Sequence, residues 1–227
     1  MIPFSDVARA AYCPRQLYYA RRDDDRSVPS EARARIDLAF RYPTLVDAPD
    51  ATLRRLPIRR SPAAYRRNLD RLRDRDDYTR LADPDRERAF VSGKDCHGTV
   101  HKVLAGESDG SDSPATTDPP VPTVVSSGEP PENGVWEPQA VRAVAAAKAV
   151  AWERERAVPR ALVEYPSVGV VRSVRLTLRK KAAYRRAVRA VRAIDGPPAR
   201  VGDDRCSACD YRNRCGTSRR SFRSLLG

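Results

Sequence analysis

The chain has 227 residues, and its 43 Lys and Arg against 30 Asp and Glu give a formal net charge of +13. This length allows one domain with a well-developed core and excludes a large multidomain assembly. No run approaches the ~18 apolar residues of a membrane-spanning helix, and the first residues show no basic stretch followed by an apolar one. We therefore expect a cytoplasmic protein with no membrane partner.

Helical periodicity dominates the first part of the chain. Ser5 is a suitable N-cap for a helix that continues to Tyr19, and Ser30 is a suitable N-cap for a second helix. A third, amphipathic helix is expected over 61–81, where apolar residues recur three and four positions apart. We expect most of this region, residues 20–90, to form a helical insertion or lid.

The middle of the chain combines one more predicted helix with a change of composition. The helix is expected before Gly106, and the residues placed on it are Phe90, His97, Val100 and Leu104. Residues 105–134 are then rich in Gly, Ser, Asp and Pro, which predicts a flexible linker. Only 121–125 could form a short strand there.

The last part of the chain predicts a helix, a hairpin and a second helix. An Ala-rich apolar stripe after Gln139 indicates the first helix. Residues 161–165 and 168–178 indicate two strands, and 180–194 is the clearest amphipathic helix. The mixture predicts a single α/β (α+β) domain over 1–227.

The cations are concentrated in three segments that contain no Asp or Glu: 54–67, 172–192 and 212–223. Such segregation favours a surface for a polyanion, because neutralising phosphates and releasing their counterions is the main sequence-independent source of nucleic-acid affinity. Solvated helix faces with no partner are the alternative. We expect DNA to bind mainly through Arg172, Arg175, Arg179, Lys180, Arg185, Arg186 and Arg189.

Three of the five cysteines form a C-x2-C-x5-C pattern near the end of the chain, Cys206, Cys209 and Cys215, within the segment 205–216. Cys13 is the candidate for a fourth ligand, and Cys96 is expected to pack as a small apolar residue. Four thiolates suit either a zinc ion or an iron–sulfur cluster. Joining Cys13 to the others would close a loop of about 190 residues and remove roughly 5 kcal/mol of unfolded-state entropy, so loss of the metal should loosen the fold.

Residues 12–18, Tyr-Cys-Pro-Arg-Gln-Leu-Tyr, resemble the N-terminal Y-C-P-R-x-x-Y signature of RecB-like nucleases that carry an iron–sulfur cluster. The group that the chain resembles is the CRISPR-associated exonucleases, which act in spacer acquisition and antiviral defence. The resemblance implies a PD-(D/E)XK fold, with a small mixed sheet flanked by helices. It also implies a 4Fe–4S cluster on Cys13, Cys206, Cys209 and Cys215, single-stranded or end-containing DNA as substrate, and integrase proteins of CRISPR adaptation as partners.

The resemblance also implies where a catalytic metal ion would bind. His97 matches the histidine of a G-x-x-x-H motif that begins at Gly93, and Asp109 matches the strand aspartate. The E-x-K motif is missing, because Val124 and Ser126 stand where its Glu and Lys should be. A later Q-x-x-x-Y motif keeps Gln139 but has Ala at position 143.

Three hypotheses follow from these residues. The first is a DNA-binding iron–sulfur protein whose nuclease centre has eroded. The second is an active exonuclease that uses Mg²⁺ or Mn²⁺ with relocated residues, in which Asp109, Asp112 or Glu129 replaces the carboxylates and Lys148 replaces the lysine. The third is a zinc-stabilised nucleic-acid-binding protein unrelated to nucleases.

Overall fold

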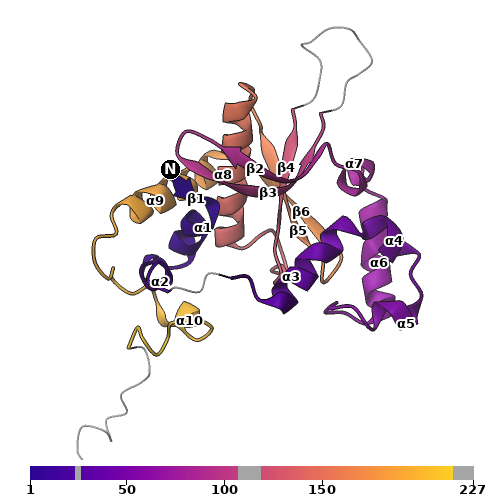
Figure 1. Ribbon diagram of the computed structural model, residues 1–227, viewed down its shortest axis with the longest axis horizontal. Helices are drawn as coiled ribbons and strands as arrows, with labels where there is room; N and C mark the ends of the chain where they lie inside the picture. The colour runs from indigo at the N-terminus through magenta and orange to yellow at the C-terminus, as the bar shows by residue number, and fades with distance from the viewer. Residues whose placement is uncertain (24–26, 107–118, 217–227) are drawn as a thin grey trace, which may run out of the picture.

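The computed structural model describes residues 1–23, 27–106 and 119–216, which form a mixed sheet with helices on both faces (Figure 1). The strands are β1 (Ile2–Pro3), β2 (Arg86–Ser92), β3 (Cys96–Leu104), β4 (Val121–Val125), β5 (Arg160–Tyr165) and β6 (Val170–Arg175). The helices are α1 (Phe4–Tyr12), α2 (Pro14–Ala20), α3 (Ser30–Asp37), α4 (Tyr42–Val46), α5 (Asp50–Leu53), α6 (Pro62–Arg73), α7 (Tyr78–Ala82), α8 (Glu137–Glu153), α9 (Leu178–Arg192) and α10 (Asp203–Cys206), with a 3-10 helix over Leu38–Phe40. The predicted α+β class is confirmed.

The six strands form one sheet. Five of them follow the order β1-β3-β4-β5-β6, and β2 pairs with β3 outside this order. β2 and β3 form an antiparallel hairpin, and β4 joins β3 antiparallel. β4 and β5 are parallel, which requires a crossover, and α8 supplies it. β5 and β6 form the second hairpin, close to the predicted 161–165 and 168–178.

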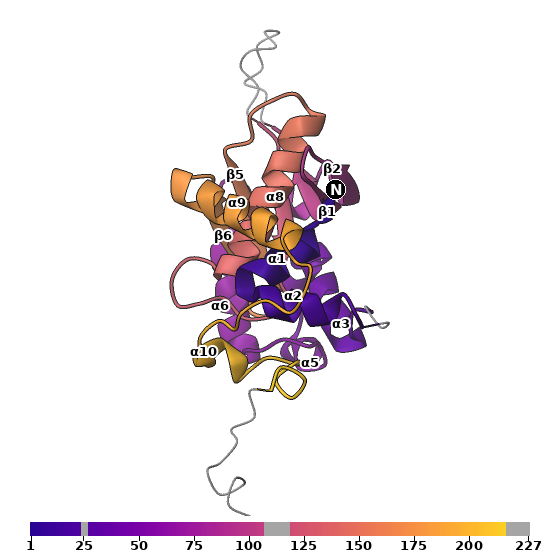
Figure 2. The ribbon, with the colours of Figure 1, turned by 90° about the vertical axis from the view of Figure 1, so that its left-hand side faces the viewer.

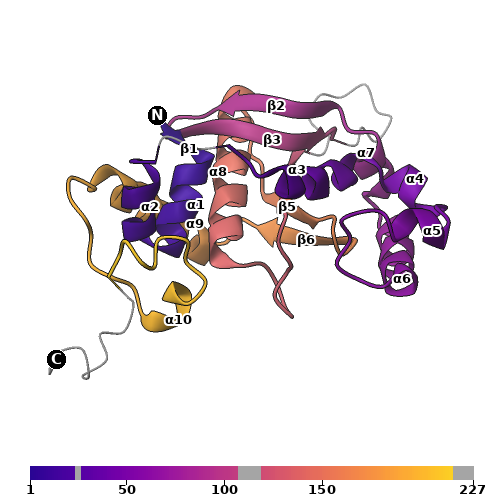
Figure 3. The ribbon, with the colours of Figure 1, turned by 60° about the horizontal axis from the view of Figure 1, so that its bottom comes forward.

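One face of the sheet is covered by α1, α8 and α9 (Figure 3). α8 buries most of its 17 residues, because its many alanines let α1 and the sheet approach its backbone closely. α9 begins at a Thr177 side chain that accepts a hydrogen bond from the Lys180 amide, and it buries Tyr184, Ala187, Val188 and Val191.

The other face is covered by the helices between residues 30 and 82. The predicted helix over 61–81 is divided in two, α6 and α7, and Ser61 caps the first by accepting from the Ala64 amide. α6 is fixed to the sheet by two hydrogen bonds: the Tyr65 hydroxyl donates to the Pro166 carbonyl at 2.8 Å, and Asn68 donates to the Val168 carbonyl at 2.7 Å.

Two sequence-based predictions of helices are wrong. The helix expected before Gly106 is the β2–β3 hairpin, because Ala89 and Val91 are buried on either side of the exposed Phe90, the alternation of a strand. The first helix does not run on to Tyr19 but is interrupted between α1 and α2 at Cys13, because the proline at position 14 disfavours helical geometry in the residue before it. Neither predicted serine is an N-cap, because Ser5 lies inside α1, which begins at Phe4, and Ser30 is the first residue of α3.

The expected linker contains the short strand that the sequence allowed there, and all five residues of β4 are buried. None of the helices in the described part of the chain combines the length and the apolar character needed to cross a membrane.

Candidate iron–sulfur and nucleic-acid site

The interruption between α1 and α2 places Cys13 at the edge of the N-terminal helices. Its backbone is extended, with φ −162° and ψ 116°, so its side chain leaves the direction of both helices. Cys13 is 8% exposed. The proline that ends the first helix therefore also positions this thiol.

The C-terminal segment brings the other three thiols to the same place. Cys206, Cys209 and Cys215 line one pocket together with Cys13, and tyrosines close much of its wall. Tight turns hold the segment, with the Cys209 amide donating to the Cys206 carbonyl at 3.2 Å. Thiols from both ends of the chain thus face one space, as the sequence predicts.

Hydrogen bonds and a ring contact join the two ends around this pocket. Figure 2 shows the C-terminal segment with α10 running below α2. The Tyr12 hydroxyl donates to the Arg205 carbonyl, and the Arg205 guanidinium donates back to the Tyr12 carbonyl at 2.7 Å. The rings of Tyr19 and Tyr211 stack with centroids 5.9 Å apart, and Asp23 accepts from Tyr211. The C-terminal segment is therefore docked by protein contacts as well as by any bound metal.

The side chains beside the four sulfurs suit thiolates. Gln16 directs its amide nitrogen toward the Cys209 sulfur at 3.9 Å, and Cys215 contributes to raising the pKa of Arg15, after a hydrogen bond to Tyr19. Donors and cations beside sulfur favour the thiolate form that binds metal. Within the described ranges, no three His, Cys, Asp or Glu side chains are close enough together to hold a single metal ion.

Cys96 is remote from this pocket. It is buried between β3 and α9, where its sulfur lies 3.3 Å from the Tyr184 hydroxyl. Burial raises the pKa of the Cys96 thiol, so it remains neutral and behaves as a core residue.

Among the described residues, the candidates for the nuclease centre belong to no group of three His, Cys, Asp or Glu side chains that could hold a metal ion. His97 is half-buried on β3, with its ring 5.6 Å from that of Phe90. Val124 is buried, and the Ser126 hydroxyl accepts from the Gly128 amide at 3.3 Å. Asp109 and Asp112 lie outside the described residues.

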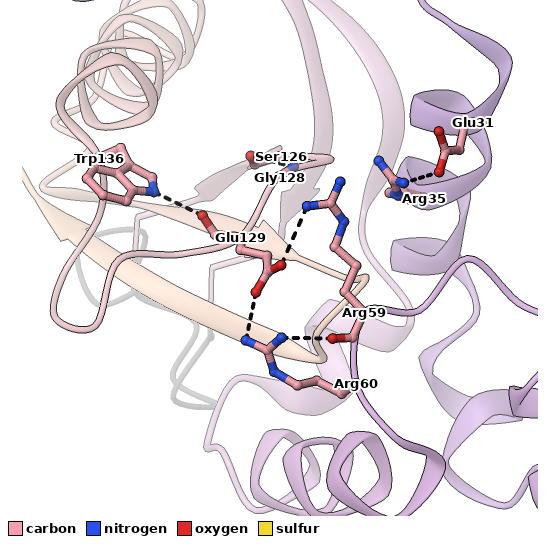
Figure 4. A network of polar contacts seen from close by, with 8 residues as sticks. All are labelled: Glu31, Arg35, Arg59, Arg60, Ser126, Gly128, Glu129 and Trp136. Carbon is pink, nitrogen blue, oxygen red and sulfur yellow. Dashed lines mark hydrogen bonds and ion pairs between the residues drawn. The ribbon is translucent and has the colours of Figure 1, made fainter. Parts of the chain in front are cut away.

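Glu129, a candidate replacement ligand, is held by two arginines (Figure 4). Its carboxylate lies 2.7 Å from Arg60 and 3.5 Å from Arg59, and its carbonyl accepts from the Trp136 indole at 2.9 Å. The hydrogen bond from Arg60 is the main cause that lowers the pKa of Glu129. The carboxylate is thus already engaged by cations.

Gln139 and Lys148 lie on the same helix but in different pockets. Gln139 lines a pocket with Ser126, whereas Lys148 lines one with Gly93 and its ammonium lies 5.9 Å from the Tyr184 ring centroid. Nine helical residues separate the two by about 13 Å along the axis. Lys148 therefore does not share the pocket of the missing E-x-K lysine.

Most of the predicted DNA-binding cations lie on or beside α9. Arg179, Lys180 and Arg186 line a groove between α8 and α9, in which Arg186 pairs with Glu137 at 3.6 Å. Burial, followed by repulsion from Arg179, lowers the pKa of Lys180. The remaining members are Arg175, Arg185 and Arg189, all exposed.

Arg172 is set apart from this groove. It lines a separate pocket beside α6, and it donates to the Glu132 carbonyl at 3.3 Å. Part of its hydrogen-bonding capacity is therefore already used within the protein.

Sequence reasoning missed three buried polar residues. His101 accepts from the Val125 amide at 3.1 Å, and Lys102 pairs with Glu164 at 3.2 Å inside the protein. His101 and Lys102 lie in a run of five buried residues at the end of β3, a segment that the sequence analysis assigns to a helix, and Glu164 lies in the expected strand over 161–165.

Comparison with models of known protein families gives no match to this chain. A comparison with curated proteins likewise finds none that is similar. The functional argument below therefore depends on the residues and their arrangement.

Proposed function

We propose that the protein is a DNA-binding iron–sulfur protein of the CRISPR-associated RecB-like exonuclease family whose nuclease centre has been lost. One observation carries the proposal: Cys13 and the three C-terminal cysteines line one pocket, although about 190 residues separate them in sequence. The small mixed sheet with helices on both faces fits the core that the resemblance implies.

The four cysteines would hold a 4Fe–4S cluster, which would cross-link the two ends of the chain when bound. Tyr12, Tyr19 and Tyr211 would cover it and limit access of water. A protein purified without oxygen is expected to be brown and to bleach on oxidation. A colourless preparation with stoichiometric zinc would favour the zinc-stabilised alternative instead.

The arrangement of the catalytic candidates supports loss of hydrolysis. Mg²⁺ and Mn²⁺ need several oxygen ligands around one position. His97 lies beside Phe90, Glu129 is paired with two arginines, and Val124 offers no oxygen ligand at all. Manganese-dependent degradation of single-stranded DNA that is abolished by His97→Ala would overturn this part of the proposal.

DNA binding would use the exposed cations of α9. The double variant Arg185→Glu/Arg189→Glu is expected to bind single-stranded DNA at least about tenfold more weakly, and the slope of log affinity against log salt should fall by about 2. Fluorescence anisotropy over a range of salt concentrations measures both.

The matched control is Arg33→Glu/Arg71→Glu, which changes the net charge equally on exposed positions of the helical insertion outside the three basic segments. Its affinity should stay within about threefold of the wild type, since general electrostatic attraction alone is screened by salt. An equal loss of DNA affinity in both double variants would contradict a specific DNA-binding face on α9.

A further inference from the structure

Arg142 is a cation with no partner in the described part of the protein. It lies on α8, one helical turn after Gln139, and its side chain is partly buried. Its Nε atom is shielded from solvent and has no hydrogen-bond acceptor, and no carboxylate in the described ranges pairs with it. Burial lowers the pKa of Arg142, but not enough to neutralise a guanidinium.

The position beside Arg142 is also incomplete. The Gln139 side-chain oxygen is shielded from solvent and has no donor. Buried polar groups are almost always satisfied in folded proteins, and a buried charge without a partner is costly. A ligand between these two side chains would satisfy both.

Both side chains line one pocket at the carboxyl end of β4. The other polar residues of its wall are Ser126 and Ser127, and no Asp or Glu is among the described residues that line it. Arg142 is the one charged side chain among the described residues that line it. The pocket is thus electropositive and carries hydroxyl and amide donors.

The residue behind the pocket adds no competing anion. His101 is buried, and its Nδ1 accepts from the Val125 amide. Burial first, and then Arg142, lowers the pKa of His101 to about 3, so the imidazole is neutral at physiological pH. Arg142 therefore remains the one charge that faces the ligand position among the residues that line the pocket.

We infer that this pocket binds a phosphate group. The planar guanidinium of Arg142 would donate to two phosphate oxygens, the hydroxyls of Ser126 and Ser127 would donate to others, and the Gln139 amide can turn its nitrogen toward the ligand. The phosphate can come from inorganic phosphate or from the end of a DNA strand. The second source rests on the proposed DNA-binding function, whereas the first does not.

Thermal unfolding with inorganic phosphate tests the pocket without DNA. At constant ionic strength, set with chloride, added phosphate should raise the melting temperature of the wild type, because a ligand that binds only the folded state stabilises it. Arg142→Gln should weaken phosphate binding by tenfold or more. The control Lys148→Gln removes an exposed charge from the same helix and should respond as the wild type does.

A second variant separates binding from folding. Arg142→Met fills similar space without charge, so in phosphate-free buffer it should melt no lower than the wild type and should lose the phosphate response. If Arg142 had a purely structural role, Arg142→Met would instead melt at a lower temperature than the wild type. No stabilisation of the wild type by 10 mM phosphate, or an unchanged response in Arg142→Gln, would overturn the inference.

The source is identified with single-stranded oligonucleotides that carry a 5′-phosphate, a 3′-phosphate or hydroxyl ends. Tighter binding of a phosphorylated end that Arg142→Gln abolishes would assign the pocket to strand ends. Equal binding of the three oligonucleotides, together with stabilisation by inorganic phosphate, would assign it to the free ion. DNA binding that persists without any phosphate effect would reject the pocket and leave the proposed function standing.

Discussion

The two histidines of the chain lie four residues apart on β3 but in opposite surroundings. His97 is half exposed beside Phe90, whereas His101 is 8% exposed beneath β4 and α8. The sequence resemblance pointed to His97, but the structure makes His101 the histidine with the stronger influence on stability. A buried neutral imidazole favours the deprotonated native state.

The free energy of unfolding should therefore decrease as the pH is lowered, because His101 becomes protonated in the unfolded chain first. The pKa of His101 is lowered from 6.5 to about 3, so between these values the unfolded chain binds a proton that the native state does not. Each pH unit in this window costs about 1.4 kcal/mol, so the wild type should lose about 2 kcal/mol more than His101→Asn between pH 7 and pH 5. Urea unfolding at both pH values gives the difference, and parallel losses in the two proteins would refute it.

Lys102 on β3 and Glu164 on β5 form a buried ion pair across the strand between them, β4. Lys102 also donates to the Ala39 carbonyl at 2.6 Å and the Leu81 carbonyl at 2.8 Å, and Thr123 donates to Glu164 at 2.5 Å. Both side chains are 1% exposed or less. The ammonium thus connects the helical insertion to the sheet.

Removing one partner of this pair should lower the free energy of unfolding more than removing both charges does. Lys102→Met leaves Glu164 as an uncompensated buried anion, and we expect a loss of about 3 to 5 kcal/mol in unfolding free energy. Lys102→Met/Glu164→Gln keeps an acceptor for Thr123 and should recover at least about 1 kcal/mol. Urea unfolding measures both variants, and a double variant less stable than Lys102→Met would disprove the argument.

At the scale of elements, the helices with long apolar stripes could be predicted and the β2–β3 hairpin could not. α9 and α8 were recognised because their apolar residues repeat with helical spacing over many residues. The hairpin was missed because His97, Val100 and Leu104 also fit helical spacing, while the decisive alternation spans only Ala89 to Val91. Pairing of β3 with β2 and β4 decides that this segment forms a strand and not a helix.

Gly93, the first residue of the G-x-x-x-H motif, has a role in packing that the motif does not reveal. A Cβ atom at this position would lie 2.8 Å from the Ala149 Cα of α8, so the β2–β3 turn can approach the helix only with glycine. Packing against α8 therefore explains the glycine of the G-x-x-x-H motif. Arg142 could not be predicted as unpaired, because its lack of a counter-ion is a property of the folded surroundings.

At the scale of the whole molecule, the convergence of Cys13 on the C-terminal cysteines was predicted from the sequence, and the docking contacts around it were not. The C-x2-C-x5-C pattern marks three sulfurs by their spacing, and the resemblance of the Y-C-P-R motif adds Cys13. The stacking of Tyr19 on Tyr211 depends on the path of the chain after α9, which no local pattern encodes.

Loss of one thiol should therefore weaken the entire fold. Cys13→Ala is expected to lose the visible absorption of the cofactor and up to about 5 kcal/mol of stability, since the cross-link no longer restricts the unfolded chain. Cys96→Ala is the control, because it removes a buried thiol outside the pocket and should keep the absorption. Undiminished thermal stability of Cys13→Ala would rule out a stabilising cross-link.

The same convergence sets an order of events during synthesis. A ribosome that adds 5 to 20 residues per second needs roughly 10 to 40 seconds between Cys13 and Cys206. During that interval the nascent chain exposes one thiol of the pocket while the other three do not yet exist. The proposed cluster could therefore be completed only after synthesis of Cys215, and a nascent chain that stops before Cys206 would lack three of its four ligands.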